Sequence, residues 1–299
     1  MFGEYKKSDK EAGTVDDLVH SDITDLDTLV NMIKLSFSFA DGANMIALCD
    51  RLYSHVNQKY QELQLYKARK KPIQPIHTKR PLVYYYGYSH LMKGMAFQKQ
   101  GKYEAARDCI EKYAELGWFN GLDQYGEAEV EYYRYAARAN LYALDILSGH
   151  AEVLQEYIEF LRNNPEELLP GLLSIVEGAS RYDYPLEAVL ESFAEQIEGF
   201  TYFEEPVNVS YYFRFCYQLA LYYIKQQQFT VALGYILQSL MLSDTLGMEH
   251  EHEFRKCTAI FEIFRSQATA TQQDQYITIL KGVLKDEKID FTPSVAQSV

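Results

Sequence analysis

The stretch GMAFQKQGKYEAARDCI, residues 94–110, decides the fold of this chain, and ALYYIKQQQFTVALGYI, residues 220–236, repeats its pattern. Each stretch begins with a small residue, and an aromatic residue follows three positions later. A polar turn then leads to a second aromatic residue, an alanine and an isoleucine. Small residues let two antiparallel helices approach closely, and aromatic side chains fill the groove between them. The pattern therefore predicts two helical hairpins, and a repeated hairpin indicates a stacked array.

Weaker copies of the pattern lie along the rest of the chain. The fold class that we predict is all-α, an α-solenoid of about six antiparallel hairpins with helices spaced by short polar turns. The helical pairs are expected at residues 25–66, 82–116, 129–161, 167–197, 210–246 and 251–285. The domains are expected as a flexible segment at 1–24, a degenerate pair at 25–66, a basic proline-rich linker at 67–81, the repeat domain at 82–288 and a flexible tail at 289–299.

The composition supports a helical interior and argues against two classes of partner. Hydrophobic residues make up 47% of the chain, with only 8 prolines and 16 glycines, which suits helices joined by short turns. The net charge of −13 makes the chain by itself a poor binder of nucleic acid. The sequence has no apolar run long enough to span a bilayer, so we expect no membrane association.

The four cysteines indicate the compartment. They are widely separated, each lies within an expected helix, and no spacing suggests zinc. We interpret them as small core residues of a protein in a reducing environment, and the expected location is the cytoplasm. They are Cys49, Cys109, Cys216 and Cys257.

The segment 67–81 carries six basic side chains and no acidic one, and three prolines interrupt it. Prolines end the preceding helix and hold such a segment extended. One interpretation is an exposed linker whose charges stay in water or pair with acidic neighbours. The other is a basic contact for a partner or for DNA phosphates.

No pattern of catalytic chemistry is found in the sequence, so we predict no enzyme, no cofactor and no metal. Phosphate loops, dinucleotide fingerprints and nucleophile elbows are absent. The run EHEHE at residues 249–253 is the one cluster that resembles metal ligands. Its histidines are two positions apart, which directs them to different faces of a helix, so we expect a solvated turn.

The hairpin at residues 94–110 resembles a tetratricopeptide repeat (TPR). The wider stretch LVYYYGYSHLMKGMAFQKQGKYEAARDCIEKYAELGWF, residues 82–119, is similar to the repeat region of cytosolic regulators from Gram-positive bacteria. Rap-type, PlcR-type and PrgX-type peptide-pheromone receptors belong to this group. The resemblance implies a TPR-like solenoid that senses a short signalling peptide in quorum sensing, regulates transcription and forms a homodimer.

One departure from that group concerns DNA. Such transcription factors carry a basic helix-turn-helix module ahead of the repeats. Only about 24 residues precede the first expected helix here, too few for that module. We therefore expect contact with DNA only through a helix-turn-helix domain not present in this chain, or action through protein partners alone.

Helical spacing projects a candidate binding face from the first helix of each pair. An extended peptide needs amide and guanidinium donors for its carbonyl groups and its C-terminal carboxylate. The peptide- or partner-binding residues that we predict are Asn31, Tyr88, Gln98, Lys99, Arg138, Asn140, Arg214, Tyr217 and Lys225.

Three functions remain open at this point. The first is a peptide-sensing region of a cytosolic transcriptional regulator. The second is a stand-alone TPR adaptor that binds another protein; few cations lie on the expected face, which disfavours a carboxylate clamp for chaperone tails. The third, least favoured, is an enzyme such as a Rap-like phosphatase.

Overall fold

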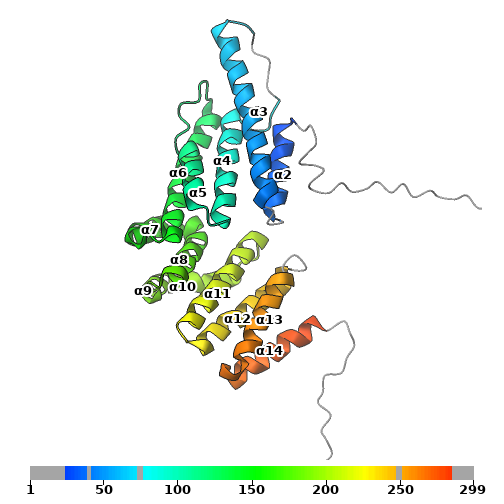
Figure 1. Cartoon of the computed structure of the whole chain (residues 1–299), viewed down its shortest axis with the longest axis vertical. Helices are drawn as coiled ribbons and strands as arrows, with labels where there is room; N and C mark the ends of the chain where they lie inside the picture. Colours follow the sequence, from blue (N-terminus) through cyan, green and yellow to red (C-terminus); the bar gives the residue numbers. More distant parts are fainter. Residues whose placement is uncertain (1–23, 39–41, 73–76, 247–250, 285–299) are drawn as a thin grey trace, which may run out of the picture. The chain divides into compact units, whose positions relative to one another are not determined.

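A computed structural model describes residues 24–38, 42–72, 77–246 and 251–284. Across these ranges the chain forms thirteen α-helices and short 3-10 turns, without a strand, which confirms the all-α class (Figure 1). It divides into two compact units, Met1–Leu144 and Asp145–Val299, and each is described by itself. The expected flexible segments at 1–24 and 289–299 lie outside the described residues, except for residue 24.

The first unit consists of four helices and most of a fifth. They are α2 (Leu26–Ser38), α3 (Gly42–Ala68), α4 (Leu82–Lys99), α5 (Tyr103–Ala114) and α6 (Gln124–Ser148), whose last turn belongs to the second unit. Helix α3 packs against both α2 and α4, and α4 packs against α5 (Figure 1). Their apolar faces form one core that extends from Leu26 to Leu144.

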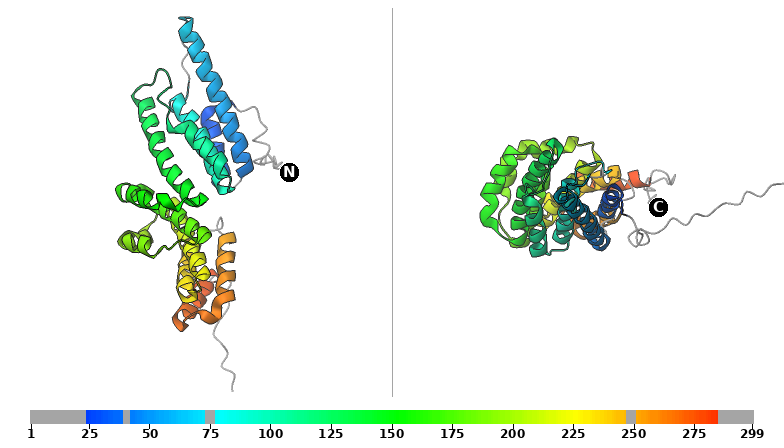
Figure 2. Two further views of the ribbon diagram at one scale, coloured as in Figure 1. Left: turned by 60° about the vertical axis from the view of Figure 1, so that its left-hand side comes forward. Right: turned by 90° about the horizontal axis from the view of Figure 1, so that it is seen from above.

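The second unit contains the remaining helices. They are α7 (Leu154–Asn163), α8 (Leu168–Tyr182), α9 (Glu187–Ser192), α10 (Ala194–Gly199), α11 (Pro206–Lys225), α12 (Phe229–Leu246), α13 (Glu251–Phe264) and α14 (Ala270–Val283). Helix α11 packs against α8 and α12, and α12 packs against α13 and α14 (Figure 2). Helix positions agree with the expected pairs, except that the second helix of the pair at 167–197 is two short helices meeting at Phe193.

The hairpin of α4 and α5 has the close approach and the turn that its sequence predicts. A Cβ atom on Gly94 would lie 3.2 Å from the Cβ of Cys109 on α5, closer than an ordinary van der Waals contact, so the absence of a side chain at Gly94 permits this approach of the two helices. Helix α4 ends in a Schellman motif, in which Lys102 N donates to Phe97 O and Gly101 N donates to Gln98 O, both at 2.9 Å. Gly101 has a φ of 70°, the left-handed conformation that this motif requires.

The hairpin of α11 and α12 repeats this turn bond for bond. Gln228 N donates to Tyr223 O at 2.9 Å, and Gln227 N donates to Ile224 O at 3.0 Å. Gln227, in the place of the glycine, has a φ of 59°. The sequence repeat is therefore a structural repeat, although a side chain occupies the left-handed position in the second copy.

Reciprocal substitutions at these two turns measure that difference. We expect Gln227→Gly to stabilise the second unit by about 0.5–1 kcal/mol, because relief of left-handed strain exceeds the entropy that glycine adds to the unfolded chain. Gly101→Gln should destabilise the first unit by about 1 kcal/mol. A Cβ at Gly101 would meet no atom within 4 Å, so the loss reports the backbone alone. Chemical denaturation measures both free-energy changes. A destabilised Gln227→Gly variant would contradict the claim that the left-handed conformation of Gln227 is strained.

Tyrosine is abundant, with 26 residues, and some of these side chains fill the space between helices. The Tyr133 ring on α6 is 0% exposed and lies over Gly87 of α4. Its hydroxyl donates to Tyr84 O at 2.7 Å, so the buried polar group is satisfied. Gly87 is the position where α4 has no side chain to obstruct the ring.

A cluster of aromatic rings joins α3, α4 and the segment that follows α5. Tyr86 of α4 contacts Trp118 and His90 with ring centroids 5.3 and 4.9 Å apart, and Tyr60 of α3 contacts Trp118 at 5.8 Å. His90 is 6% exposed, also contacts Tyr53, and its Nε2 makes no hydrogen bond to any described residue. Burial, together with the charges of two nearby lysines, lowers the pKa of His90 to about 4.

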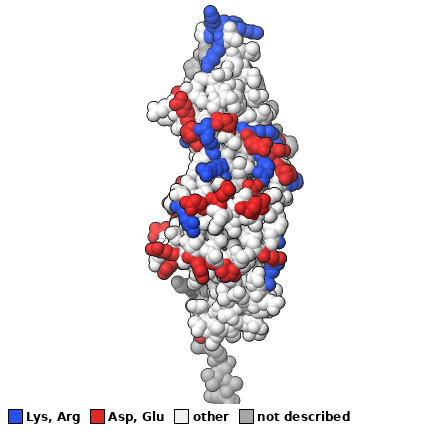
Figure 3. Space-filling model, turned by 90° about the vertical axis from the view of Figure 1, so that its left-hand side faces the viewer, with Lys and Arg blue, Asp and Glu red and all other residues white. Residues whose placement is uncertain are grey.

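The basic segment 67–81 is exposed at one end and attached at the other. Arg69, Lys70 and Lys71 are exposed where α3 ends, and basic side chains gather at that end in Figure 3. Arg80 forms an ion pair with the buried Glu129 of α6, and the Arg80 backbone N–H donates a hydrogen bond to the Tyr85 hydroxyl at 3.2 Å. Residues 73–76 lie outside the described part of the chain.

The four cysteines are core residues, as the sequence predicts. Cys49, Cys109, Cys216 and Cys257 are all buried and free. Burial raises the pKa of each thiol, and the pKa values of Cys216 and Cys257 reach about 12. A buried thiol with a raised pKa stays protonated near neutral pH, which disfavours the nucleophilic thiolate form.

Candidate functional site

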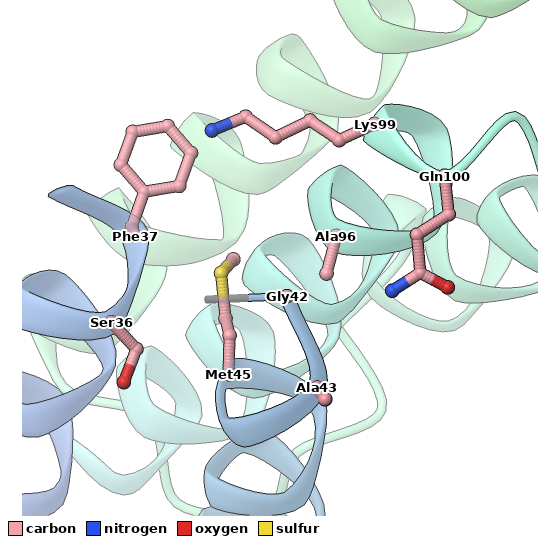
Figure 4. A pocket seen from close by; sticks show the side chains of 8 residues that line it. All are labelled: Ser36, Phe37, Gly42, Ala43, Met45, Ala96, Lys99 and Gln100. Carbon is pink, nitrogen blue, oxygen red and sulfur yellow. The ribbon is translucent and has the colours of Figure 1, made fainter. Parts of the chain in front are cut away.

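A pocket lies in the first unit where three helix ends meet. The last turn of α2, the first turn of α3 and the last turn of α4 enclose about 340 Å³ (Figure 4). Helix α3 runs antiparallel to α4, so its beginning lies beside the end of α4. The described lining residues are Ser36, Phe37, Gly42, Ala43, Met45, Ala96, Lys99 and Gln100.

The walls of this pocket are mainly apolar and consist largely of small residues. Ala43 and Ala96 lie on one side, the Met45 side chain lies between Ala96 and Ser36, and Phe37 lies at the far edge (Figure 4). At Gly42 even a methyl group would lie 3.1 Å from the Nε2 atom of Gln100. The small side chains leave the space that a larger residue at any of these positions would fill.

The polar groups at the rim are mainly hydrogen-bond donors. The Lys99 ammonium lies 3.7 Å from the centre of the Phe37 ring, a cation–π contact across the rim. The Gln100 amide nitrogen faces the start of α3 at Gly42. The first N–H groups of a helix have no partner within it, and this end of the helix carries partial positive charge. Among the described lining residues, the pocket therefore combines apolar walls with one cation, Lys99, and one amide, Gln100.

The Schellman motif that ends α4 positions two of these donors. Its left-handed residue Gly101 turns the chain directly after Gln100, so Lys99 and Gln100 stand in the last helical turn beside α3. Lys102, the last residue of the motif, does not line the pocket, and its ammonium lies 5.9 Å from the Phe97 ring centre. Two lysines three positions apart thus occupy different surroundings.

Of the predicted binding residues in the first unit, the structure brings one to this pocket, Lys99. Gln98 is half-buried beside it in sequence, and Asn31 is exposed on α2. Tyr88 is buried and stacks on Tyr84 with ring centroids 5.6 Å apart, so it belongs to the core.

The two predicted residues on α6 have neighbours of their own. Asn140 Nδ2 donates to the Tyr113 hydroxyl at 2.9 Å, which holds α6 against α5. Arg138 is exposed, and its guanidinium lies 5.9 Å from the Tyr142 ring centre. Neither residue lines the pocket.

In the second unit, two of the three predicted residues join α11 to α8. Arg214 pairs with Glu177 at 3.3 Å, and burial raises the pKa of that carboxyl although the guanidinium opposes the shift. Lys225 donates to Asp183 Oδ1 at 2.7 Å and to Ser180 O at 2.8 Å. These cations neutralise carboxylates of the neighbouring helix.

The third, Tyr217, is half-buried and stacks on Phe213 of the same helix with centroids 6.4 Å apart. A separate pocket of about 450 Å³ lies between the start of α7 and α9. Its lining includes side chains of both charges, Glu152 and Arg162, and none of the predicted binding residues.

Most of the pocket was not predicted from the sequence. The missed lining residues are Ser36, Phe37, Gly42, Ala43, Met45, Ala96 and Gln100. One signal was available: if α3 packs antiparallel to both α2 and α4, the end of α2, the start of α3 and the end of α4 lie at the same end of the unit. Small residues such as Gly42, Ala43 and Ala96 would then have marked the pocket.

Within the described ranges, no group of three or more His, Cys, Asp or Glu side chains could hold a metal ion. Of the run at residues 249–253, Glu249 and His250 lie outside the described residues, and His252 is exposed on α13. None of the described helices is both long and apolar enough to cross a bilayer. Comparison with family models, curated proteins and solved structures found no match for this chain.

Proposed function

We propose that this chain is a TPR-like interaction module that binds a short signalling peptide and serves as the sensor region of a cytosolic transcriptional regulator. One observation carries the proposal: two hairpins far apart in the sequence share the same turn, hydrogen bond for hydrogen bond. Repeated helical hairpins that cannot bury their apolar faces alone stack into arrays, and such arrays bind other chains along extended surfaces.

The pocket of the first unit supports a peptide as the ligand. Its volume of about 340 Å³ lies at the lower end of the range for ligand pockets, roughly 300–1,000 Å³, and suits one side chain. Lys99, one of the residues predicted from the helical pattern, lies at its rim. A peptide inserts single side chains into such pockets while its remaining residues contact the surface.

Selection from a library tests the proposal. The whole chain, immobilised, is presented with a library of random heptapeptides that have free ends, and enriched peptides are resynthesised and titrated by calorimetry. We expect one related set of sequences with dissociation constants of about 1 μM or lower, and scrambled peptides of identical composition should bind at least tenfold more weakly.

Thermal unfolding provides an independent readout. A peptide at a concentration of one hundred times its dissociation constant should stabilise the folded chain by about 2.7 kcal/mol. If no selected peptide exceeds its scrambled control, the peptide-sensing function is wrong. Capture of a folded protein or of a long protein segment in its place would favour the stand-alone adaptor.

A further inference from the structure

We propose that a second copy of this chain inserts the basic end of α3 into the groove between α7 and α9. The basic end consists of residues 65–71, and the groove is the pocket of about 450 Å³ that α7 and α9 line. This contact goes beyond peptide binding, because it joins two copies of the chain and uses neither a peptide nor the pocket of the first unit. Charge, apolar surface and the lack of other partners point to it.

The basic end of α3 carries four cations within five residues. Arg69, Lys70 and Lys71 are exposed and form no ion pair with any described residue (Figure 3). Lys67 Nζ donates to a backbone carbonyl, Asn120 O, at 3.5 Å, so its charge has no carboxylate opposite it. The helix dipole favours cations at this end, but four of them side by side repel one another. An acidic surface of a partner would relieve that repulsion.

The turn that ends α3 holds these cations in place. Lys71 N donates to Tyr66 O at 3.0 Å and Lys70 N donates to Lys67 O at 3.1 Å, the same Schellman pattern that ends α4 and α11. A closed helix end loses little conformational freedom when a partner covers it. Leu65 and Tyr66 lie one helical turn before the cations and are 54% and 40% exposed. The basic end therefore presents apolar and cationic groups together.

The groove between α7 and α9 has an apolar floor. The aliphatic residues that line it are Leu154, Ile158, Pro185, Ala188 and Val189. Its volume of about 450 Å³ is enough for one or two side chains of a docking helix. Every residue of this groove belongs to the second unit and to the described part of the chain.

The edges of the groove are acidic. Glu152 lines it just before α7, Glu156 follows one helical turn later, and Glu191 lies on α9 beside the lining. Glu156 and Glu191 are exposed and form no ion pair with any described residue. The one cation of the lining, Arg162, is paired with Glu159 at 3.4 Å. Residues 150–205 contain thirteen acidic and two basic side chains, so the groove lies in a negative field.

A second copy accounts for both surfaces, whereas another class of partner accounts for one. A nucleic acid would fit the basic end, but the net charge of −13 repels it and the groove would stay empty. Within a pair of copies, cations meet carboxylates while Leu65 and Tyr66 meet the apolar floor. Homo-oligomers are mostly closed and symmetric, and in a two-fold dimer the contact occurs twice. Two weak contacts then act together.

Sedimentation of the full chain measures the association. Exposed ion pairs are individually weak and are screened by salt. At about 50 mM NaCl we expect a dimer with a dissociation constant of about 10–100 μM. At about 500 mM NaCl the dissociation constant should rise at least tenfold. A chain that stays monomeric at about 200 μM in low salt, or a dimer that salt does not weaken, would overturn the proposal.

Charge reversal on each surface locates the contact. The variant Arg69→Glu/Lys71→Glu reverses the basic end, and Glu152→Lys/Glu191→Lys reverses the edges of the groove. Each variant alone should dimerise at least about tenfold more weakly, because like charges then face each other. An equal mixture of the two should dimerise again, since each reversed surface meets its opposite on the other copy. A mixture that remains monomeric would contradict the pairing of these two surfaces.

A control variant separates the contact from net charge. Lys102→Glu/Lys281→Glu changes the net charge as much as the variant of the basic end, at two exposed positions outside both surfaces. It should dimerise like the original chain, and a loss equal to that of the basic-end variant would overturn the proposal. Circular dichroism verifies the fold of each variant. If a variant does not fold, the salt dependence of the original chain still decides. Peptide selection is a separate measurement, so failure of the proposed function leaves this result unaffected.

Discussion

Replacement of Gly87 by alanine is expected to destabilise the first unit by about 3 kcal/mol, at the upper end of the usual cost of overpacking. The new Cβ would lie 2.5 Å from Cζ and 2.6 Å from Cδ2 of the Tyr133 ring, closer than carbon atoms approach without displacement. The ring cannot yield easily, because it is fully buried and its hydroxyl is bonded to Tyr84 O. Urea unfolding, with hydrogen exchange of peptides from α4 and α6 to localise the effect, measures the loss.

A second glycine-to-alanine change is the control. At Gly234 within α12 the nearest atom to a new Cβ is Gln272 Nε2 at 3.7 Å, so alanine fits. We expect a gain of about 0.5–1 kcal/mol there from helix propensity alone. In the Gly87→Ala background, Tyr133→Leu should lower the free energy of unfolding by less than it does in the original chain, because the new methyl group and the Tyr133 ring compete for one space. Strictly additive effects would contradict the proposed collision.

The stability of the first unit should fall as the pH decreases from about 6.5 to 4, and His90 should account for about 3 kcal/mol of that fall. The pKa of His90 is lowered to about 4 by burial among the rings of Tyr53 and Tyr86, and the nearby Lys112 and Lys93 add to the shift while Asp50 opposes it. Below the pKa that this histidine has in the unfolded chain, the unfolded state binds a proton that the buried His90 of the folded state does not bind. The contribution of His90 to stability is therefore complete above pH 6.5 and is lost on acidification.

A His90→Phe variant separates this contribution from the titration of carboxylates. Phenylalanine keeps the ring contacts and removes the basic nitrogen, so its free energy of unfolding should depend less on pH between 6.5 and 4. Replacement of the exposed His77 by glutamine should leave the profile of the original chain unchanged. Denaturant midpoints across this range are the measurement, and parallel profiles for His90→Phe and the original chain would contradict the assignment.

The hairpins could be predicted because their determinants are local. The left-handed turn at Gly101 and the close approach at Gly94 depend on residues within one short stretch, and the same spacing located α11 and α12. The role of Gly87 was not visible in the sequence, because the ring that covers it belongs to α6. The break between α9 and α10 at Phe193 was equally hidden, since no proline or glycine marks it.

The candidate site was predictable only in part, for a similar reason. Helical spacing placed Lys99 on an accessible face near the end of α4, where it lines the pocket. The same reasoning could not foresee that Arg214 and Lys225 pair with carboxylates of α8, since those partners lie about forty residues earlier in the chain. Pockets between helix ends depend on which turns coincide in space, and this becomes visible only after the helices have been packed.

Trp118, in the aromatic cluster of the first unit, is the single tryptophan of the chain. Fluorescence excited at wavelengths that only indole absorbs therefore reports on one place, where Trp118 lies beside Tyr60 and Tyr86 and is 48% exposed. The tyrosines are distributed over both units and contribute to the near-ultraviolet circular dichroism of each. Tryptophan emission and tyrosine dichroism, followed together, consequently distinguish melting of the first unit from melting of the second without any added label.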